Sequence, residues 1–137
     1  MFEVGRTYRR KALHDAYGGQ RQGGISTPSR FPFLMLFTGM AGTKYGYSDA
    51  WNPDRTAYMF YGEGQMGDMA FRRGNRAIRD HAANGKDLHL FKTDGRGHGT
   101  YMGQFVIAGH HLETRTSDVS GTHRTAIVFR LVPAAAK

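Results

Sequence analysis

The most informative stretch of the chain reads His14-Asp15-Ala16-Tyr17-Gly18-Gly19-Gln20-Arg21-Gln22-Gly23-Gly24-Ile25-Ser26-Thr27-Pro28. Its two glycine pairs allow backbone conformations closed to other residues and a close approach to a ligand. A hydrophobic core has no use for the Gln-Arg-Gln triplet between them, so we expect these side chains to face a partner outside the protein. A polyanion suits a chain with a formal charge of +8, and an ordinary solvated loop is the alternative.

Charge and composition narrow the class of protein. The chain has 137 residues, enough for one domain, and 13 of its 19 Lys and Arg residues lie in residues 1–30 and 67–96. Such clustering is typical of nucleic-acid-binding proteins, although ribosomal, heparin-binding and membrane-surface proteins share it. The absence of cysteine excludes a disulfide framework and a thiol nucleophile. No apolar run approaches the roughly 20 residues needed to span a bilayer, so we expect a soluble intracellular protein.

The hydrophobic pattern predicts an α+β domain over residues 1–133, with residues 134–137 as a linker or an appended tail. One helix is expected over Thr7–Tyr17, capped by Thr7, and a second from an N-cap at Asn75 to Gly85, with Ile78 and Ala82 facing inward. Short strands, a turn at Trp51–Asp54 and an exposed polar loop over Glu113–Thr122 complete the pattern. The expected strands are Phe31–Thr38, Lys44–Tyr47, Ala57–Tyr61, Asp87–Lys92, Thr100–Ala108 and Arg124–Val132. This arrangement favours a small, strongly curved sheet or a partly open β-barrel with two main helices.

The usual signatures of catalysis are missing. The chain has no Walker loop, no Gly-x-Ser-x-Gly elbow and no His-Glu-x-x-His motif. His110 and His111 are adjacent, and adjacent residues of a strand point to opposite faces, so they are poor candidates for one metal site. We therefore expect a binding domain without metal or cofactor, and not an enzyme.

A second basic segment surrounds the predicted second helix. Arg72, Arg76 and Arg79 have helix-like spacing, and Arg73 lies between them, so together they could present guanidinium groups to DNA phosphates. An exposed helix start at Asn75 would add backbone N–H groups suited to an anion. The alternative is that these arginines pair with Asp80, Asp68 or Glu63.

Three segments of the chain resemble one protein family. They are the opening helix with His-x-x-Tyr-Gly-Gly-Gln-Arg-Gln-Gly-Gly-Ile-Ser-Thr-Pro, the Phe-Thr-Gly…Tyr-Gly-Tyr-Ser-Asp-Ala-Trp segment, and Tyr-Gly-Glu-Gly-Gln-Met-Gly-Asp-Met…Gly-Asn-Arg-Ala-Ile. Together they resemble the N-terminal sulfur-binding domain of McrA-type HNH endonucleases of type IV, modification-dependent restriction systems, and more distantly SRA domains with a PUA-like barrel. The resemblance implies recognition of phosphorothioate DNA and a C-terminal HNH nuclease domain in the natural protein.

A sulfur reader requires an apolar surface surrounded by cations. Sulfur is less well hydrated than oxygen, and stripping water from a phosphate oxygen costs roughly 1–3 kcal/mol in protein contexts. Ile25, Thr27 and Pro28 lie next to Arg21 and Arg30 in the sequence. The family resemblance implies a proline ring in the sulfur cavity, and Pro28 is the candidate, with a proline before a strand as the alternative.

Other side chains of the first segment could contact bases or phosphates. Gln20 and Gln22 suit adenine, Arg21 suits guanine, and Tyr17 and His14 could contact a phosphate. The alternative functions are a reader of modified cytosine, with a flipped base among Tyr45, Tyr47 or Trp51, and a general nucleic-acid-binding domain. We expect Trp51, Tyr58, Phe60 and Tyr61 to belong to the core. The candidate site residues are Arg10, His14, Tyr17, Gln20, Arg21, Gln22, Gly23, Gly24, Ile25, Ser26, Thr27, Pro28, Arg72, Arg73, Asn75, Arg76 and Arg79.

Overall fold

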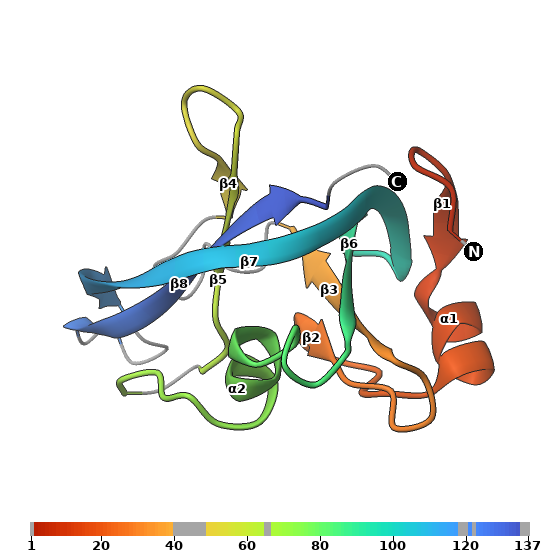
Figure 1. The fold of residues 1–137 in the computed structure, drawn as a ribbon, viewed down its shortest axis with the longest axis horizontal. Helices are drawn as coiled ribbons and strands as arrows, with labels where there is room; N and C mark the ends of the chain where they lie inside the picture. Colours follow the sequence, from red (N-terminus) through yellow and green to blue (C-terminus); the bar gives the residue numbers. More distant parts are fainter. Residues whose placement is uncertain (1, 40–48, 65–66, 118–120, 122, 135–137) are drawn as a thin grey trace.

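The computed structural model describes residues 2–39, 49–64, 67–117, 121 and 123–134, which form one eight-stranded mixed sheet and two helices (Figure 1). The elements are β1 (Thr7–Arg9), α1 (Arg10–Tyr17), β2 (Ile25–Ser26), β3 (Phe33–Thr38), β4 (Ala50–Trp51), β5 (Tyr58–Tyr61), α2 (Arg73–Arg79), β6 (Asp87–Thr93), β7 (His98–Ser117) and β8 (His123–Pro133). The strands run in the order β2-β3-β6-β7-β8-β5-β4, and β1 pairs with β7. The predicted α+β class with a sheet and two main helices is confirmed.

The two longest strands, β7 and β8, form an antiparallel ribbon that runs across the molecule (Figure 1). Register shifts between Ile107 and Gly109 and between Glu113 and Thr116 interrupt the ribbon, and such bulges increase the local twist. The first half of β7 pairs with β1 and β6, whereas β8 pairs with β5. The ribbon therefore joins the two ends of the sheet.

Strand β3 is buried along its whole length because its two faces belong to two different hydrophobic clusters. Leu34 and Leu36 pack in the larger cluster, with α2 and strands β5 to β8, while Phe33 and Phe37 pack in a second cluster with α1. The predicted core aromatic residues are confirmed, since two are buried and two pack against the larger cluster. The buried pair is Tyr58 and Phe60, and the partly buried pair is Trp51 and Tyr61.

The first helix is shorter than predicted. Residues 7–9 form β1, in which Thr7 pairs with Thr100 and the two side-chain hydroxyl oxygens lie 2.9 Å apart. Thr7 therefore belongs to the sheet and does not cap the helix. Similarly, the strand expected from Phe31 begins at Phe33, after the proline at position 32, which has no N–H for the sheet.

The second helix begins and ends earlier than predicted. It spans Arg73–Arg79, so Asn75 is a buried residue inside the helix and not its N-cap. The Asn75 side-chain amide donates to the carbonyl groups of Glu63 and Ala70 at 2.9 and 3.0 Å, which holds the helix against the preceding loop. Ile78 faces the core as predicted, whereas Ala82 follows the helix end and is exposed.

Two further expectations are wrong in part. Residues 113–117, predicted as a loop, belong to β7, because a ribbon open to solvent accepts polar side chains. Trp51 ends β4, and the turn follows it at residues 52–55. The expected strand Lys44–Tyr47 lies outside the described residues. No helix in the described ranges is both long and apolar enough to cross a membrane.

Candidate nucleic-acid interface

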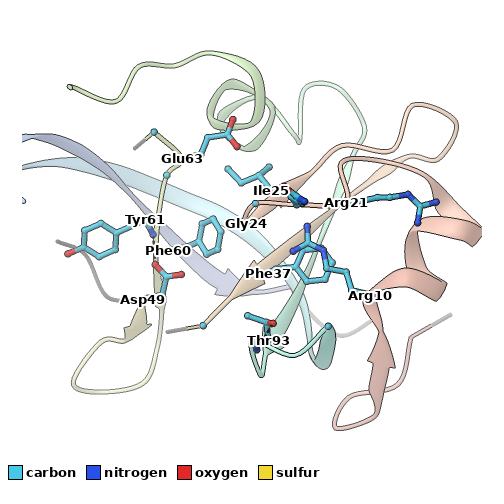
Figure 2. Close-up of a pocket in the computed structure, with 17 residues that line it drawn as sticks. Arg10, Arg21, Gly24, Ile25, Phe37, Asp49, Phe60, Tyr61, Glu63 and Thr93 are labelled. Atoms are coloured by element: carbon cyan, nitrogen blue, oxygen red, sulfur yellow. Dashed lines mark hydrogen bonds between the residues drawn. The ribbon is translucent and has the colours of Figure 1, made fainter. Parts of the chain in front are cut away.

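A cavity of about 600 Å³ opens between the loop after α1, the ends of β3 and β5, and the turn between β6 and β7 (Figure 2). Two arginines lie on one side of this cavity, and two carboxylates lie on the other (Figure 2). We call Arg10, Arg21 and residues 22–24 the basic wall, and Asp49, Tyr61 and Glu63 the acidic wall. The remaining lining residues are Ile25, Phe37, Gly39, Phe60, Gly62, Gly64, Thr93, Gly95 and Gly97.

The two arginines of the basic wall are held differently. The Arg10 guanidinium lies over the Phe37 ring, with its central carbon 3.9 Å from the ring centroid, and donates to the Gln20 carbonyl at 3.3 Å. Arg21 is exposed and donates to the Asp15 carboxylate at 2.8 Å, and Lys11 donates to the same carboxylate at 3.2 Å. Arg10 is therefore fixed against the protein, whereas the contact that holds Arg21 within the described residues is a surface ion pair.

His14 lies behind the basic wall and is 3% exposed. Its Nδ1 is 2.8 Å from the Gly18 carbonyl oxygen, which can only accept, and its Nε2 is 2.9 Å from Arg10 Nε, which can only donate. These two contacts define a neutral ring with the proton on Nδ1. Burial lowers the pKa of His14, and Arg10 and Arg21 lower it further, against the Gly18 carbonyl and Asp15, which raise it.

The glycine-rich loop is stabilised by its own side chains. Gln20 Oε1 accepts from the Thr27 N–H at 2.6 Å and from the Thr27 hydroxyl at 3.0 Å. Gly19 has a φ of +79°, and a Cβ there would collide with Ser26 Oγ and lie 3.3 Å from Pro28 Cδ. The loop thus needs a glycine at this position both for its conformation and for the close packing of Ser26 and Pro28.

An apolar floor connects the two walls. Ile25, Phe37 and Phe60 are 4%, 5% and 2% exposed, and all three line the cavity (Figure 2). Because Arg10 stacks on Phe37, a cation and an apolar surface lie in direct contact on the basic side. This is the combination that a poorly hydrated anionic group requires.

Asp49 is the central group of the acidic wall. Its Oδ2 accepts from the Thr38 hydroxyl at 2.7 Å, and its Oδ1 accepts from the Tyr61 N–H at 2.9 Å. The Thr38 hydroxyl donates to Asp49, so it must accept from the Tyr58 hydroxyl, which is 2.9 Å away. Burial raises the pKa of Asp49 to about 6, although both hydrogen bonds act in the opposite direction.

Glu63 occupies the part of the acidic wall nearest α2. Its Oε2 accepts from the Gly74 N–H at 3.1 Å. Burial raises the pKa of Glu63, while this hydrogen bond and the charge of Arg73 lower it. The first turn of α2 is thereby joined to the cavity wall.

Two arginines at the start of α2, Arg72 and Arg73, line a second, shallower cavity of about 460 Å³ together with Asn75, Glu63 and Asp68. The remaining two arginines of the segment, Arg76 and Arg79, are exposed on the helix. Arg79 donates to both carboxylate oxygens of Asp80, at 2.8 and 3.0 Å, as the ion-pair alternative proposed. The four arginines are thus divided between a shallow cavity and an open helix face.

The structure gathers only part of the predicted site at the main cavity. Of the first segment, Arg10 and residues 21–25 line it. The others lie elsewhere: Tyr17 packs in the second cluster, Gln20 and Thr27 bind each other, and Ser26 and Pro28 are buried. Trp51 packs against the core, and Tyr45 and Tyr47 lie outside the described residues.

The sequence analysis missed the acidic wall and Phe37. Asp49 ends the Tyr-Gly-Tyr-Ser-Asp segment, and Glu63 lies between two glycines, where no core would place a carboxylate. A carboxylate within or directly after a segment rich in glycine and aromatic residues could therefore have predicted these two residues as part of the site. Among the described residues, no group of three or more His, Asp and Glu side chains could hold a metal ion.

Comparison with solved structures identifies proteins of the same fold. The sulfur-binding and SRA domains of ScoMcrA, complexed with phosphorothioated DNA, share 26% identity with this chain at a TM-score of 0.78, over 99% of this chain and 41% of that chain. The type IV phosphorothioation-dependent restriction endonuclease ScoMcrA gives 26% identity and a TM-score of 0.77, over 99% of this chain and 27% of the endonuclease. This chain therefore spans less than half of either ScoMcrA chain.

A more distant likeness supports the fold alone. The SRA domain of SUVH5, complexed with hemimethylated CG DNA, shares 17% identity at a TM-score of 0.70, over 99% of this chain and 91% of that chain. No curated protein sequence matched the chain. The family model described as "ScoMcrA-like, SRA domain" matches residues 4–137, and the chain belongs to this family.

Proposed function

We propose that this domain binds duplex DNA carrying a phosphorothioate linkage, as the recognition module of a type IV restriction system. The observation that carries the proposal is the 26% identity, over 99% of this chain, with 41% of a ScoMcrA chain that holds the sulfur-binding and SRA domains and is complexed with phosphorothioated DNA. The domain itself binds and does not cleave. Cleavage is assigned to an HNH nuclease domain elsewhere in the natural protein, acting in the bacterial cytoplasm.

The basic wall supplies a suitable chemical environment for sulfur. Arg10 and Arg21 provide charge for a phosphate, and Ile25 and Phe37 provide apolar surface beside that charge. A sulfur atom placed on this surface loses little hydration, whereas an oxygen in the same place would lose roughly 1–3 kcal/mol without compensation. Pro28, which is buried behind the loop, remains a predicted contributor.

A second candidate function is the reading of a modified cytosine, and the cavity itself favours it. Its volume of about 600 Å³ greatly exceeds that of one sulfur atom and has room for a base flipped out of the duplex. The Asp49 carboxylate could accept from the exocyclic amino group of cytosine, as acidic side chains do in base recognition.

One binding experiment separates the two functions. Four otherwise identical duplexes carry an Rp phosphorothioate, an Sp phosphorothioate, a methylcytosine or no modification, and their dissociation constants are measured by fluorescence anisotropy at one fixed salt concentration. A phosphorothioate reader binds the Rp duplex at least about tenfold more tightly than the unmodified duplex, since desolvation alone supplies about that discrimination. Preference for methylcytosine would support the second candidate, and equal binding to all four duplexes would contradict both.

Matched variants locate the ligand. Asp49→Asn should reduce preference for methylcytosine and leave preference for sulfur unchanged, because only a base edge needs that carboxylate. Asp54→Asn, in the exposed turn between β4 and β5, is the control for loss of one acidic charge. If both variants change binding equally, Asp49 contacts no base.

A further inference from the structure

Arg10 is a half-buried cation that lines the cavity without a carboxylate partner in the described part of the chain. The sequence between Gly39 and Asp49 contains no acidic residue that could supply one. Burial lowers the pKa of the Arg10 guanidinium, yet arginine stays protonated in proteins. Because buried charges are normally paired, this guanidinium is prepared for an anion from outside the chain.

The Arg10 side chain is fixed at three points. Its guanidinium stacks on Phe37 at 3.9 Å, it donates to the Gln20 carbonyl, and its Nε donates to His14 Nε2 at 2.9 Å. At the backbone, the Arg10 N–H donates to the Gly97 carbonyl at 2.8 Å. The Nε contact depends on the state of another side chain, because His14 accepts only while its ring is neutral.

We propose that Arg10 binds one phosphate or phosphorothioate group of the DNA, and that His14 is its positioning residue, holding the guanidinium through the neutral Nδ1–H tautomer. This inference rests on the proposed DNA binding, and it assigns the anion contact to one side chain. The Gly18 carbonyl keeps the His14 proton on Nδ1 and leaves Nε2 as the acceptor for Arg10. His14 thus acts on DNA only through Arg10.

Protonation of His14 should release Arg10. A second proton on Nε2 would replace an acceptor by a donor and place a cation against the guanidinium. The charged groups around His14 are Arg10 and Arg21, which oppose protonation, and Asp15, which favours it; the Phe37 ring also faces His14, with ring centroids 5.9 Å apart. Because the pKa of His14 is lowered, DNA binding should weaken only at a pH below the usual histidine range. Protonation of exposed histidines would instead strengthen DNA binding in acid.

The first part of the test concerns Arg10. The affinity for a modified and an unmodified duplex is measured as a function of salt for the wild type and for Arg10→Gln. Loss of one phosphate contact should reduce affinity about tenfold at moderate salt and lower the slope of log K against log salt by about one. An unchanged slope would overturn the assignment of the anion contact to Arg10.

The second part concerns His14 and uses two substitutions. His14→Gln is neutral at every pH and can still donate to Gly18 and accept from Arg10, so its affinity at pH 8 should stay within about twofold of wild type and no longer weaken in acid. His111→Gln, at an exposed position of β7, is the matched control and should keep the wild-type pH profile. Identical pH profiles for the wild type and His14→Gln would overturn the positioning role.

His14→Leu completes a double-mutant cycle with Arg10→Gln. Leucine should weaken binding in the wild-type background and have no further effect once Arg10 is replaced, with thermal unfolding measured for each variant. Equal weakening in both backgrounds would show a merely structural role for His14. The salt slope and the pH profile are measured on both the modified and the unmodified duplex. The roles of Arg10 and His14 can therefore be contradicted while the preference for modified DNA holds, and that preference can be absent while both roles hold.

Discussion

The basic wall of the cavity is backed by the buried side chain of His14, and the acidic wall contains the half-buried side chain of Asp49. Burial lowers the pKa of His14 and raises the pKa of Asp49, so in both cases it favours the neutral form. The consequences differ, because the neutral form of His14 is the one that accepts from Arg10, whereas Asp49 is charged at neutral pH against the preference of its surroundings.

The largest expected effect tests how strongly burial disfavours the charged Asp49 carboxylate in the acidic wall. Because the folded pKa of Asp49 is raised from 3.8 to about 6, its contribution to stability is present below about pH 4 and is lost as the pH rises through 6. Asp49→Asn should therefore raise the free energy of unfolding at pH 8 by about 1–3 kcal/mol, since one pKa unit corresponds to about 1.4 kcal/mol. Urea unfolding of the wild type and of Asp49→Asn between pH 4 and 8 measures this difference in the free energy of unfolding.

The control for this prediction is Asp54→Asn. Hydrogen bonds from the Thr56 hydroxyl and N–H lower the pKa of Asp54, so loss of this carboxylate should bring no gain in stability at pH 8. A gain of equal size in both variants would mean that removing any negative charge is enough, and that the surroundings of Asp49 are irrelevant.

The same contrast shows what could be predicted from the sequence. The basic wall is nearly continuous in the chain, so glycine pairs and a basic helix were enough to predict Arg10, Arg21 and the loop. The acidic wall joins Asp49, Tyr61 and Glu63, which belong to a strand end and two loops that only the sheet brings together. Local sequence patterns do not show which distant residues become neighbours in the fold. The prediction that the aromatic residues of β5 belong to the core is confirmed.

The predicted boundaries of the two helices were wrong for a similar reason. Thr7–Arg9 has a helical pattern, yet pairing with β7 decides its conformation. Asn75 is a residue type that is common at N-caps, yet its side chain is buried and donates to the carbonyl groups of Glu63 and Ala70. In each case a partner distant in the sequence overrides a local preference.

The next effect tests the loop of the basic wall. Gly19→Ala should destabilise the protein by about 1–3 kcal/mol, because the φ of +79° is unfavourable for alanine and the new methyl group would collide with Ser26 Oγ. Displacement of the loop should also weaken DNA binding. Gly23→Ala is the matched control, because its φ is +85° but nothing lies within 4 Å of the new Cβ.

Only the difference between these variants reports on packing. If Gly19→Ala and Gly23→Ala lower the melting temperature equally, backbone conformation alone explains the glycines, and the close packing of Ser26 and Pro28 contributes nothing.

A smaller effect compares the basic wall with the α2 arginines. Arg21→Ala should weaken DNA binding several-fold and lower the salt slope by about one, if Arg21 contacts a phosphate. Arg76→Ala, on the exposed side of α2, should give the same change in slope only if the bound duplex extends from the cavity to that helix. Salt titrations of both variants thereby measure the extent of the DNA footprint, and an unchanged slope for either variant removes that arginine from it.

The smallest expected effect concerns the ion pair that holds Arg21 in the absence of DNA. Asp15 accepts from Arg21 and from Lys11, and exposed pairs of this kind contribute only about 0–1 kcal/mol to stability. Asp15→Asn should leave the melting temperature nearly unchanged and strengthen DNA binding about two- to threefold, because two cations beside the cavity lose a competing anion. Asp80→Asn, which releases Arg79 on α2, removes the same charge at another place. If both variants gain the same affinity for DNA, the change in net charge explains the effect. If only Asp15→Asn gains affinity, DNA binds the Arg21 side chain that Asp15 holds in its absence.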